Sequence, residues 1–343
     1  MSAPRPAEVR QFPCQGCGAA MHYSPETQAL RCAHCGSQQP IPVDNQPIRE
    51  IPLDAVPPVG RLTRYTYACQ GCGAHIQSTE TALRCQFCSA ALVLDPTFSE
   101  QFLPQSILPF TVTRDQLSAI LQTALKQHLP PTELAELAYR DTTQSTYVPY
   151  WHYTARAFVD YQGWYGPQDG PRHPLQGRSP LFELRDPLSI ACRYMTKDEG
   201  SSPYTWYMDR LVPFRPEYLA GHHALPPDID QREALQVTMP LGVQRRLNTA
   251  FADYLRKLLN GTPYTIANRN DDFSPTTAKL TLVPLWVAHY AYKGKDYRLF
   301  VHGQEGDVLN RTPPGPLGLG CTLTLFALLA GVVALLIWFL IAR

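Results

Sequence analysis

The sequence predicts an α+β chain with two small ribbons near its N-terminus, a β-rich mixed middle domain and one C-terminal transmembrane helix. Three observations lead to this prediction. Cysteines concentrate in the first 90 residues, aromatic and β-branched runs dominate the middle, and one long segment near the C-terminus is uncharged. The expected parts are a first ribbon at 1–45, a linker at 46–66, a second ribbon at 67–95, a middle domain at 96–310, a linker at 311–316 and the transmembrane helix at 317–342.

The composition already excludes some classes of protein. The chain has 343 residues, 17% of them charged, and a formal net charge of +1. This length allows two or three domains with a real core. A charge balance so close to zero argues against a strongly basic nucleic-acid binder and against an acidic, solvating tail.

Eight of the ten cysteines form four Cys-x-x-Cys pairs, which repeat in two units. The expected ligands are Cys14, Cys17, Cys32 and Cys35 in the first unit, and Cys69, Cys72, Cys85 and Cys88 in the second. The two pairs are separated by fourteen residues in the first unit and by twelve in the second. The sequence Ala-Leu-Arg-Cys occurs at 29–32 and again at 82–85, so the two units are an internal repeat.

This pattern is typical of zinc ribbons. Two Cys-x-x-Cys turns together supply the tetrahedral sulfur site that zinc prefers. Because four cysteines fill each coordination shell, we expect two structural Zn²⁺ ions with no position open for water. His22, His34 and His75 lie nearby and are weaker candidate ligands. A redox site is the other alternative, although it needs only one pair.

The ribbons carry little charge that would favour nucleic acid. Residues 1–94 contain seven arginines and six acidic residues, and eight thiolates with two Zn²⁺ ions make the loaded region net negative. Nonspecific binding to DNA or RNA depends on cations that neutralise phosphates. Tyr65, Tyr67, Phe12 and Phe87 can stack on bases, but such aromatic residues also form the small core of a ribbon.

The middle domain is expected to contain helices followed by strands. Thr113 and Gln116 have the spacing of a capping box, which predicts a helix from Asp115 to about His128. Further helices are expected at Thr132–Tyr139 and from Ile229 to Asn260, the latter interrupted near Pro240 and stopped by Gly261.

Two strand regions, Tyr147–Tyr165 and Leu280–Tyr292, are rich in aromatic and β-branched residues. Each is expected to be launched by a similar tetrad, Val-Pro-Tyr-Trp at 148–151 and Val-Pro-Leu-Trp at 283–286. The echo suggests an internal duplication of the middle domain into half-domains at about 105–215 and 216–310. A small meander is expected after residue 288.

No catalytic or cofactor-binding residue is assigned, and we do not expect an enzyme. The sequence has no phosphate-binding Gly-x-x-x-x-Gly-Lys-Ser/Thr loop, no His-Glu-x-x-His and no Gly-x-Ser-x-Gly. His222 and His223 are expected in a solvated loop, and Cys192 in a strand core. An enzyme that uses the aromatic middle domain remains a third class, which would need a pocket of convergent polar groups.

Residues 317–342 are apolar, glycine, threonine or cysteine, which is long enough to span a bilayer as a helix. Only Arg343 follows in the sequence, so we expect a tail anchor. Arg311 precedes the segment, and zinc-binding thiols require a reducing compartment. We therefore expect a single-pass protein of the cytoplasmic (inner) membrane with its N-terminus in the cytosol. Ala327 and Gly331 give a small-xxx-small spacing that allows a homo-oligomer through this helix.

Several segments outside the cysteines also carry a resemblance to a known family. They are Ser-Ile-Leu-Pro-Phe at 106–110, the tetrad at 148–151, Pro-Glu-Tyr-Leu-Ala-Gly at 216–221, Tyr-Lys-Gly-Lys-Asp-Tyr at 292–297 and Val-His-Gly-Gln-Glu-Gly at 301–306. With the twin ribbons and the apolar segment, the chain resembles bacterial transcription-factor-IIB-type zinc-ribbon membrane proteins, often labelled by similarity to the primosomal helicase N-prime. One departure is Ser89, which follows Cys88 where a glycine is common.

The resemblance implies a place beside PspA-like and flotillin-like envelope-stress proteins. The leading functional hypothesis is a tail-anchored, zinc-binding adaptor or scaffold that presents its ribbons and β-rich domain to a protein partner at the cytosolic face of the bilayer. The alternative is a membrane-associated regulator that binds nucleic acid through the ribbons.

Overall fold

The computed structural model describes residues 5–42, 46–56, 59, 63–95, 104–126, 143–194, 208–238, 244–292 and 295–308. These residues form a mixed, strand-rich structure, as the sequence predicts. The chain divides into two compact units, a first of Met1–Thr111 and Ser145–Pro284 and a second of Val112–Gln144 and Leu285–Arg343. The two units alternate along the chain. The expected domain boundaries and the duplication into half-domains stay predictions.

Three expected segments lie outside the described residues: the helix at Thr132–Tyr139, the linker 311–316 and the transmembrane helix 317–342. In the described part, no helix combines the length and the apolar character that a membrane span requires.

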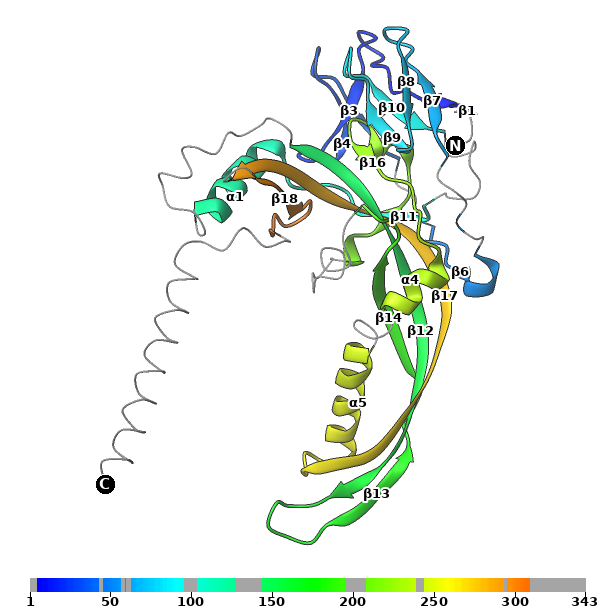
Figure 1. Cartoon of the computed structure of the whole chain (residues 1–343), viewed down its shortest axis with the longest axis vertical. Helices are drawn as coiled ribbons and strands as arrows, with labels where there is room; N and C mark the ends of the chain where they lie inside the picture. The colour runs from blue at the N-terminus through cyan, green and yellow to red at the C-terminus, as the bar shows by residue number, and fades with distance from the viewer. Residues whose placement is uncertain are drawn as a thin grey trace, which may run out of the picture. The chain divides into compact units, whose positions relative to one another are not determined.

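The two ribbons belong to the first unit and are built from short strands (Figure 1). In the first ribbon, three strands form an antiparallel sheet: β3 (Met21–Ser24), β4 (Ala29–Cys32) and β5 (Gln38–Pro40). The second ribbon contains two antiparallel hairpins, β7 (Tyr65–Ala68) with β8 (His75–Ser78), and β9 (Ala82–Arg84) with β10 (Ala91–Leu94). Short strands near the N-terminus join the second ribbon, β1 (Arg5–Pro6) on β7 and β2 (Val9–Arg10) on β10.

Two long neighbouring strands, β12 (Gln144–Tyr165) and β17 (Tyr264–Tyr292), dominate the rest of the first unit. The strands β13 (His173–Arg178) and β14 (Phe182–Ile190) pair antiparallel with β12. The sequence predicts both long strands, but it places the start of β17 at Leu280. The tetrad at 283–286 therefore lies inside β17 and does not begin it.

The first half of β17 is too polar for its sequence to predict a strand. Residues 268–272 read Asn-Arg-Asn-Asp-Asp, which are poor strand formers. They are extended because β12 lies alongside. Thr276 Oγ1 donates to Thr154 O at 3.1 Å, and Asn268 Nδ2 donates to Gln162 Oε1 at 3.5 Å. The neighbouring strand therefore overrides local propensity.

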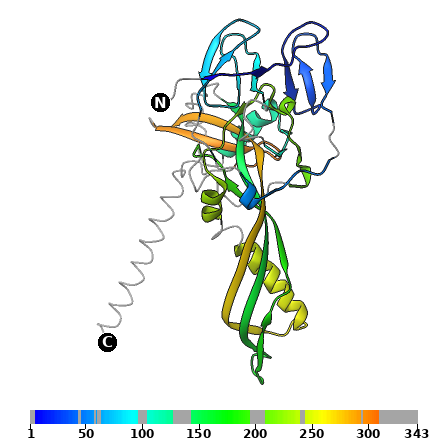
Figure 2. The same ribbon diagram turned by 90° about the vertical axis from the view of Figure 1, so that its right-hand side faces the viewer.

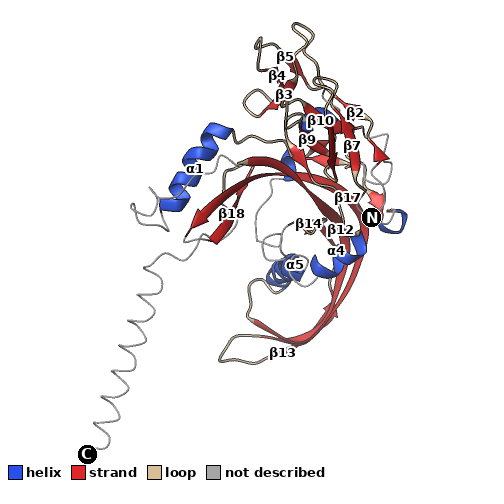
Figure 3. Ribbon diagram, turned by 45° about the horizontal axis from the view of Figure 1, so that its top comes forward, coloured by secondary structure: helices blue, strands red, loops and turns tan. Residues whose placement is uncertain are grey.

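The helix α5 (Gln244–Leu258) covers one face of these strands, as Figure 3 shows. Its buried residues Leu247, Phe251 and Leu255 recur every four positions and pack on the alternate, inward side chains of β12, such as Tyr161. The preceding helix is α4 (Gln231–Thr238), so the break expected near Pro240 falls between two helices, in residues that are not described. Gly261 has φ +77° and donates its N–H to Arg256 O, which ends α5 as predicted.

Short strands connect the second ribbon to the long strands. The strand β16 (His223–Ala224) pairs in parallel with β12 and antiparallel with β9, so one sheet runs from the ribbon into the body of the first unit. The strand β11 (Ser106–Ile107) lies between β17 and β15 (Val212–Pro213). The expected linker at 46–66 also contacts the body. Its strand β6 (Ile51–Pro52) pairs with β17, and Lys279 Nζ donates to Glu50 Oε1 at 3.2 Å.

In the second unit, the last residues of β17 pair antiparallel with β18 (Lys295–His302). The helix α1 (Arg114–Lys126) starts with the predicted capping box. Thr113 N–H donates to Gln116 Oε1 at 2.9 Å, and Gln116 N–H donates to Thr113 Oγ1 at 3.2 Å.

Candidate metal centres and their attachment

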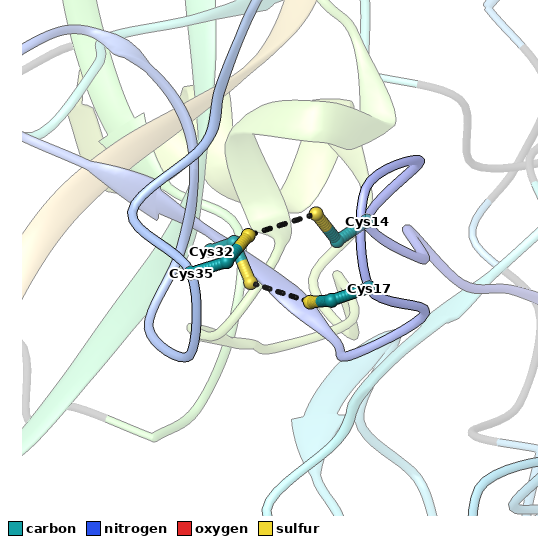
Figure 4. A group of neighbouring side chains, drawn as sticks. All are labelled: Cys14, Cys17, Cys32 and Cys35. Atoms are coloured by element: carbon teal, nitrogen blue, oxygen red, sulfur yellow. Dashed lines mark hydrogen bonds between the residues drawn. The ribbon is translucent and has the colours of Figure 1, made fainter.

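The first ribbon brings its four predicted ligands into one cluster (Figure 4). All four sulfur atoms lie within 4.8 Å of one another. Cys14 Sγ lies 3.5 Å from Cys35 Sγ, and Cys17 Sγ lies 3.6 Å from Cys32 Sγ. Four Zn–S bonds of about 2.3 Å in a tetrahedron require sulfur separations of roughly 3.8 Å. The cluster is therefore compatible with one structural zinc ion.

The second ribbon repeats this arrangement. Cys69 Sγ lies 3.5 Å from Cys88 Sγ, and Cys72 Sγ lies 3.6 Å from Cys85 Sγ. In both ribbons the first cysteine is close to the fourth and the second to the third. The expectation of two structural zinc ions is confirmed in this respect: the chain forms two four-cysteine clusters, each compatible with zinc.

Tight turns place the sulfur atoms. Gly18 and Gly73 both have φ +74°, and their N–H groups donate to Cys14 O and Cys69 O at 2.8 and 2.7 Å. After the fourth ligand of each ribbon, Gly36 has φ +75° and Ser89 has φ +59°. Ser89 stands where a glycine is common, yet the turn keeps the positive φ that a glycine would adopt there.

Polar neighbours favour thiolate at part of each cluster. The hydroxyl and backbone N–H of Ser37 lower the pKa of the Cys35 thiol to about 6. Burial acts to raise the pKa of Cys85, but the N–H groups of Cys88 and Phe87 lower it to about 7. Zinc binds the thiolate form, which these groups favour at Cys35 and Cys85. In the same clusters, burial and the neighbouring thiols raise the pKa of Cys17 and Cys88 to about 12, so these two thiols lose their protons only when the metal binds.

Histidine takes no part in either cluster, which consists of cysteines alone. The side chains of His34 and His75 are exposed on their ribbons. His22 lies against Gly221, with Nδ1 only 2.6 Å from the place that a Cβ on that glycine would occupy. Cys192 is buried, as expected, but it lies in a bend just after β14 and not within a strand. Burial raises the pKa of its thiol to about 12, which makes it unreactive.

One segment attaches both ribbons to the body, a role that the sequence did not predict for it. We call residues 219–225 the junction segment. From the first ribbon, Tyr23 N–H donates to Ala220 O at 2.8 Å. From the second ribbon, Arg84 Nε donates to Gly221 O at 2.6 Å and Thr81 N–H donates to Ala224 O at 2.8 Å. The core of the first ribbon includes Ala220 itself and Ala91 of the second ribbon.

The expectation that His222 and His223 form a solvated loop is wrong. His222 is buried and stacks on Phe110, with ring centroids 4.6 Å apart and planes at 11°. Tyr147 and Tyr23 surround the same ring. His223 is half-buried, and its Nδ1 lies 2.7 Å from Glu80 Oε2 in the second ribbon. The junction segment turns both histidines inward, and sequence spacing does not encode this.

Burial keeps His222 neutral. Neither of its ring nitrogens has a hydrogen-bond partner among the described residues. Burial, together with the positive charge of Arg84, lowers the pKa of His222 to about 3. Burial, again with Arg84, lowers the pKa of His22 to about 4. Two neutral histidines therefore lie where the first ribbon meets the body.

The fold and the site define a class of protein in which two four-cysteine zinc ribbons are built into one strand-rich body. No family model, no curated protein and no solved structure matches the chain.

Proposed function

We propose that this protein is a zinc-binding adaptor, held at the cytosolic face of a membrane by residues 317–342, which presents its ribbons to a protein partner. The observation that supports this most directly is the combination of two closed sulfur sites with ribbons that bond to the same junction segment. Closed sites favour a structural metal over catalysis. Because both ribbons bond to the same segment, they are held as one fixed docking surface and do not move as two independent domains.

The second ribbon offers a specific contact point for a partner. Phe87 lies in the last Cys-x-x-Cys turn and is 68% exposed, more than any other large hydrophobic side chain in the described residues. Exposed aromatic residues are frequent anchors in protein interfaces. The equivalent residue of the first ribbon is His34, so the two ribbons present different chemistry from the same turn.

A membrane tether would make even a weak contact effective, because it raises the local concentration of whatever the ribbons capture. By the family resemblance, PspA-like and flotillin-like envelope proteins are the first candidate partners. Self-association through the apolar segment would add a second copy of the ribbons. The nucleic-acid alternative is less favoured, because eight thiolates with two Zn²⁺ ions leave the ribbon region net negative.

The test is co-purification from natively expressing cells after mild crosslinking, with Phe87→Ala and the matched control His34→Ala. We expect one reproducible partner for the unaltered chain and for His34→Ala, with at least tenfold less for Phe87→Ala, since about 1.4 kcal/mol corresponds to a tenfold loss. Repeated recovery of the protein alone would overturn the adaptor role. A salt-sensitive gel shift with DNA or RNA would favour the alternative.

A further inference from the structure

Large exposed hydrophobic side chains gather at one end of the long strands. In the described residues, five such side chains are exposed: Phe87, Trp164, Leu181, Leu258 and Tyr264. Three of these five lie at the ends of different elements: Trp164 on β12, Leu258 on α5 and Tyr264 on β17. Within the first unit, Figure 2 shows the ends of β13 and α5 at the far end of the sheet from the ribbons.

Direct contacts hold these elements together. We call residues 163–173 and 256–265 the lobe end. Gly166 N–H donates to Pro263 O at 3.0 Å. Gly163 lies so close to β17 that a Cβ would come within 2.0 Å of Thr265 O. Trp164 and Tyr264 therefore lie on adjoining stretches of chain, and Leu258 precedes the turn that joins α5 to β17.

No packing within the first unit covers these three side chains. Trp164 is 47% exposed, Leu258 49% and Tyr264 36%, whereas the neighbouring Tyr161 and Leu255 are buried in the core beneath α5. Single exposed apolar residues are normal on a protein surface. Trp164 alternates along β12 with Tyr161 and Tyr165, which pack with α5, so Trp164 lies on the other face of the strand. The three exposed side chains, two of them aromatic with a polar tip, therefore share one end of the sheet but not one face, which suits an end-on contact.

Charge at the lobe end favours a negatively charged partner. Arg172 and Lys257 are exposed and form no ion pair among the described residues, and Arg256 pairs with Asp253 at 2.7 Å. Asp169 is the one carboxylate within the two stretches and is exposed, so the lobe end keeps a small excess of positive charge. Trp and Tyr concentrate at the interface between water and lipid, and Lys and Arg are attracted to anionic headgroups. The combination matches the headgroup region of an anionic bilayer, where rings and cations are both accommodated.

We propose that the lobe end is a second, peripheral membrane contact in which Trp164, Leu258 and Tyr264 enter the headgroup region of an anionic bilayer. This inference rests on the proposed membrane attachment, because an anchor at residues 317–342 would keep the body of the protein close to a bilayer. It goes beyond that attachment by assigning a lipid-facing surface to the folded body.

The test is hydrogen exchange of the full chain in nanodiscs that contain anionic lipid, compared with the same chain in detergent micelles. We expect exchange in the peptides that cover the lobe end to be at least about tenfold slower in the nanodiscs. The triple change Trp164→Ser, Leu258→Ser and Tyr264→Ser replaces exposed side chains, so the fold should persist while this protection is lost. Phe87→Ser is the matched control and should keep it.

Equal exchange of the lobe end in nanodiscs and micelles would overturn the proposal. Undiminished protection in nanodiscs of purely zwitterionic lipid would overturn the role given to Arg172 and Lys257. Resistance of the chain to alkaline extraction reports on residues 317–342 separately. Failure of the tether and failure of the lobe end are therefore distinguishable.

Discussion

Gly36 and Ser89 occupy the same position in the two ribbons, one residue after the fourth cysteine, and both have positive φ, +75° and +59°. In each ribbon the N–H of this residue donates to the carbonyl of the third ligand, Cys32 or Cys85. Glycine adopts this conformation freely, whereas a residue with a Cβ is strained there.

The first prediction concerns this pair. We expect Ser89→Gly to stabilise the second ribbon by about 0.5–1 kcal/mol and Gly36→Ser to destabilise the first by about 1 kcal/mol. The test adds increasing chelator and follows hydrogen exchange in the peptides of each ribbon, because a ribbon that loses its zinc exchanges faster. If the two changes shift retention in the same direction, the assigned strain is wrong.

The second prediction concerns the ligands. Cys69→Ser should reduce zinc from two ions to one per chain and should speed exchange in β16, because β16 pairs with β9 of that ribbon. Metal analysis and hydrogen exchange measure the two effects. Cys192→Ala is the control, since Cys192 lies outside both clusters and should leave two zinc ions in place. A variant with normal zinc content would exclude Cys69 as a ligand.

The third prediction concerns pH. The pKa of His222 is about 3 in the folded chain, against about 6.5 for an unperturbed histidine. Well above pH 6.5 the residue is neutral in both states, so the free energy of unfolding does not depend on pH through this group. Below pH 6.5 the unfolded state takes up a proton that the folded state excludes, so the free energy of unfolding should fall by about 1.4 kcal/mol per pH unit for this group.

Denaturant unfolding between pH 5 and 6.5 with excess zinc checks this slope. His222→Phe keeps the stacking with Phe110 but cannot titrate. The slope should fall by about 1 kcal/mol per pH unit relative to the unaltered chain. His22, whose pKa is also depressed, and the ligand thiols, which take up protons when zinc is released, contribute equally to both chains and cancel in the comparison. An unchanged slope in His222→Phe would contradict the buried, neutral assignment.

The fourth prediction compares two glycines with similar backbone angles. Gly221 has φ +85°, and a Cβ there would lie 2.6 Å from His22 Nδ1, whereas Gly261 has φ +77° with no atom within 4 Å. Gly261→Ala should cost about 1 kcal/mol of backbone strain. Gly221→Ala should cost roughly 2–4 kcal/mol, because a clash with the first ribbon is added. Equal losses in thermal unfolding would show that the ribbon yields without cost.

The sequence by itself determined the local features of this protein. The eight ligands follow from spacing, because each pair lies on one short turn. The same holds for the capping box of Thr113 and Gln116 and for the stop at Gly261, which involve residues only a few positions apart. Backbone and side-chain geometry over so short a range depends little on the rest of the chain.

Only the tertiary structure decided how these pieces combine. The polar half of β17 is a strand because β12 lies beside it, and the bond from Thr276 to Thr154 joins residues 122 positions apart. The burial of His222, the attachment of both ribbons to residues 219–225 and the grouping of Trp164 with Tyr264 depend on equally distant contacts. No local pattern encodes such contacts, because the free energy that holds them comes from surfaces that meet only once the chain has folded.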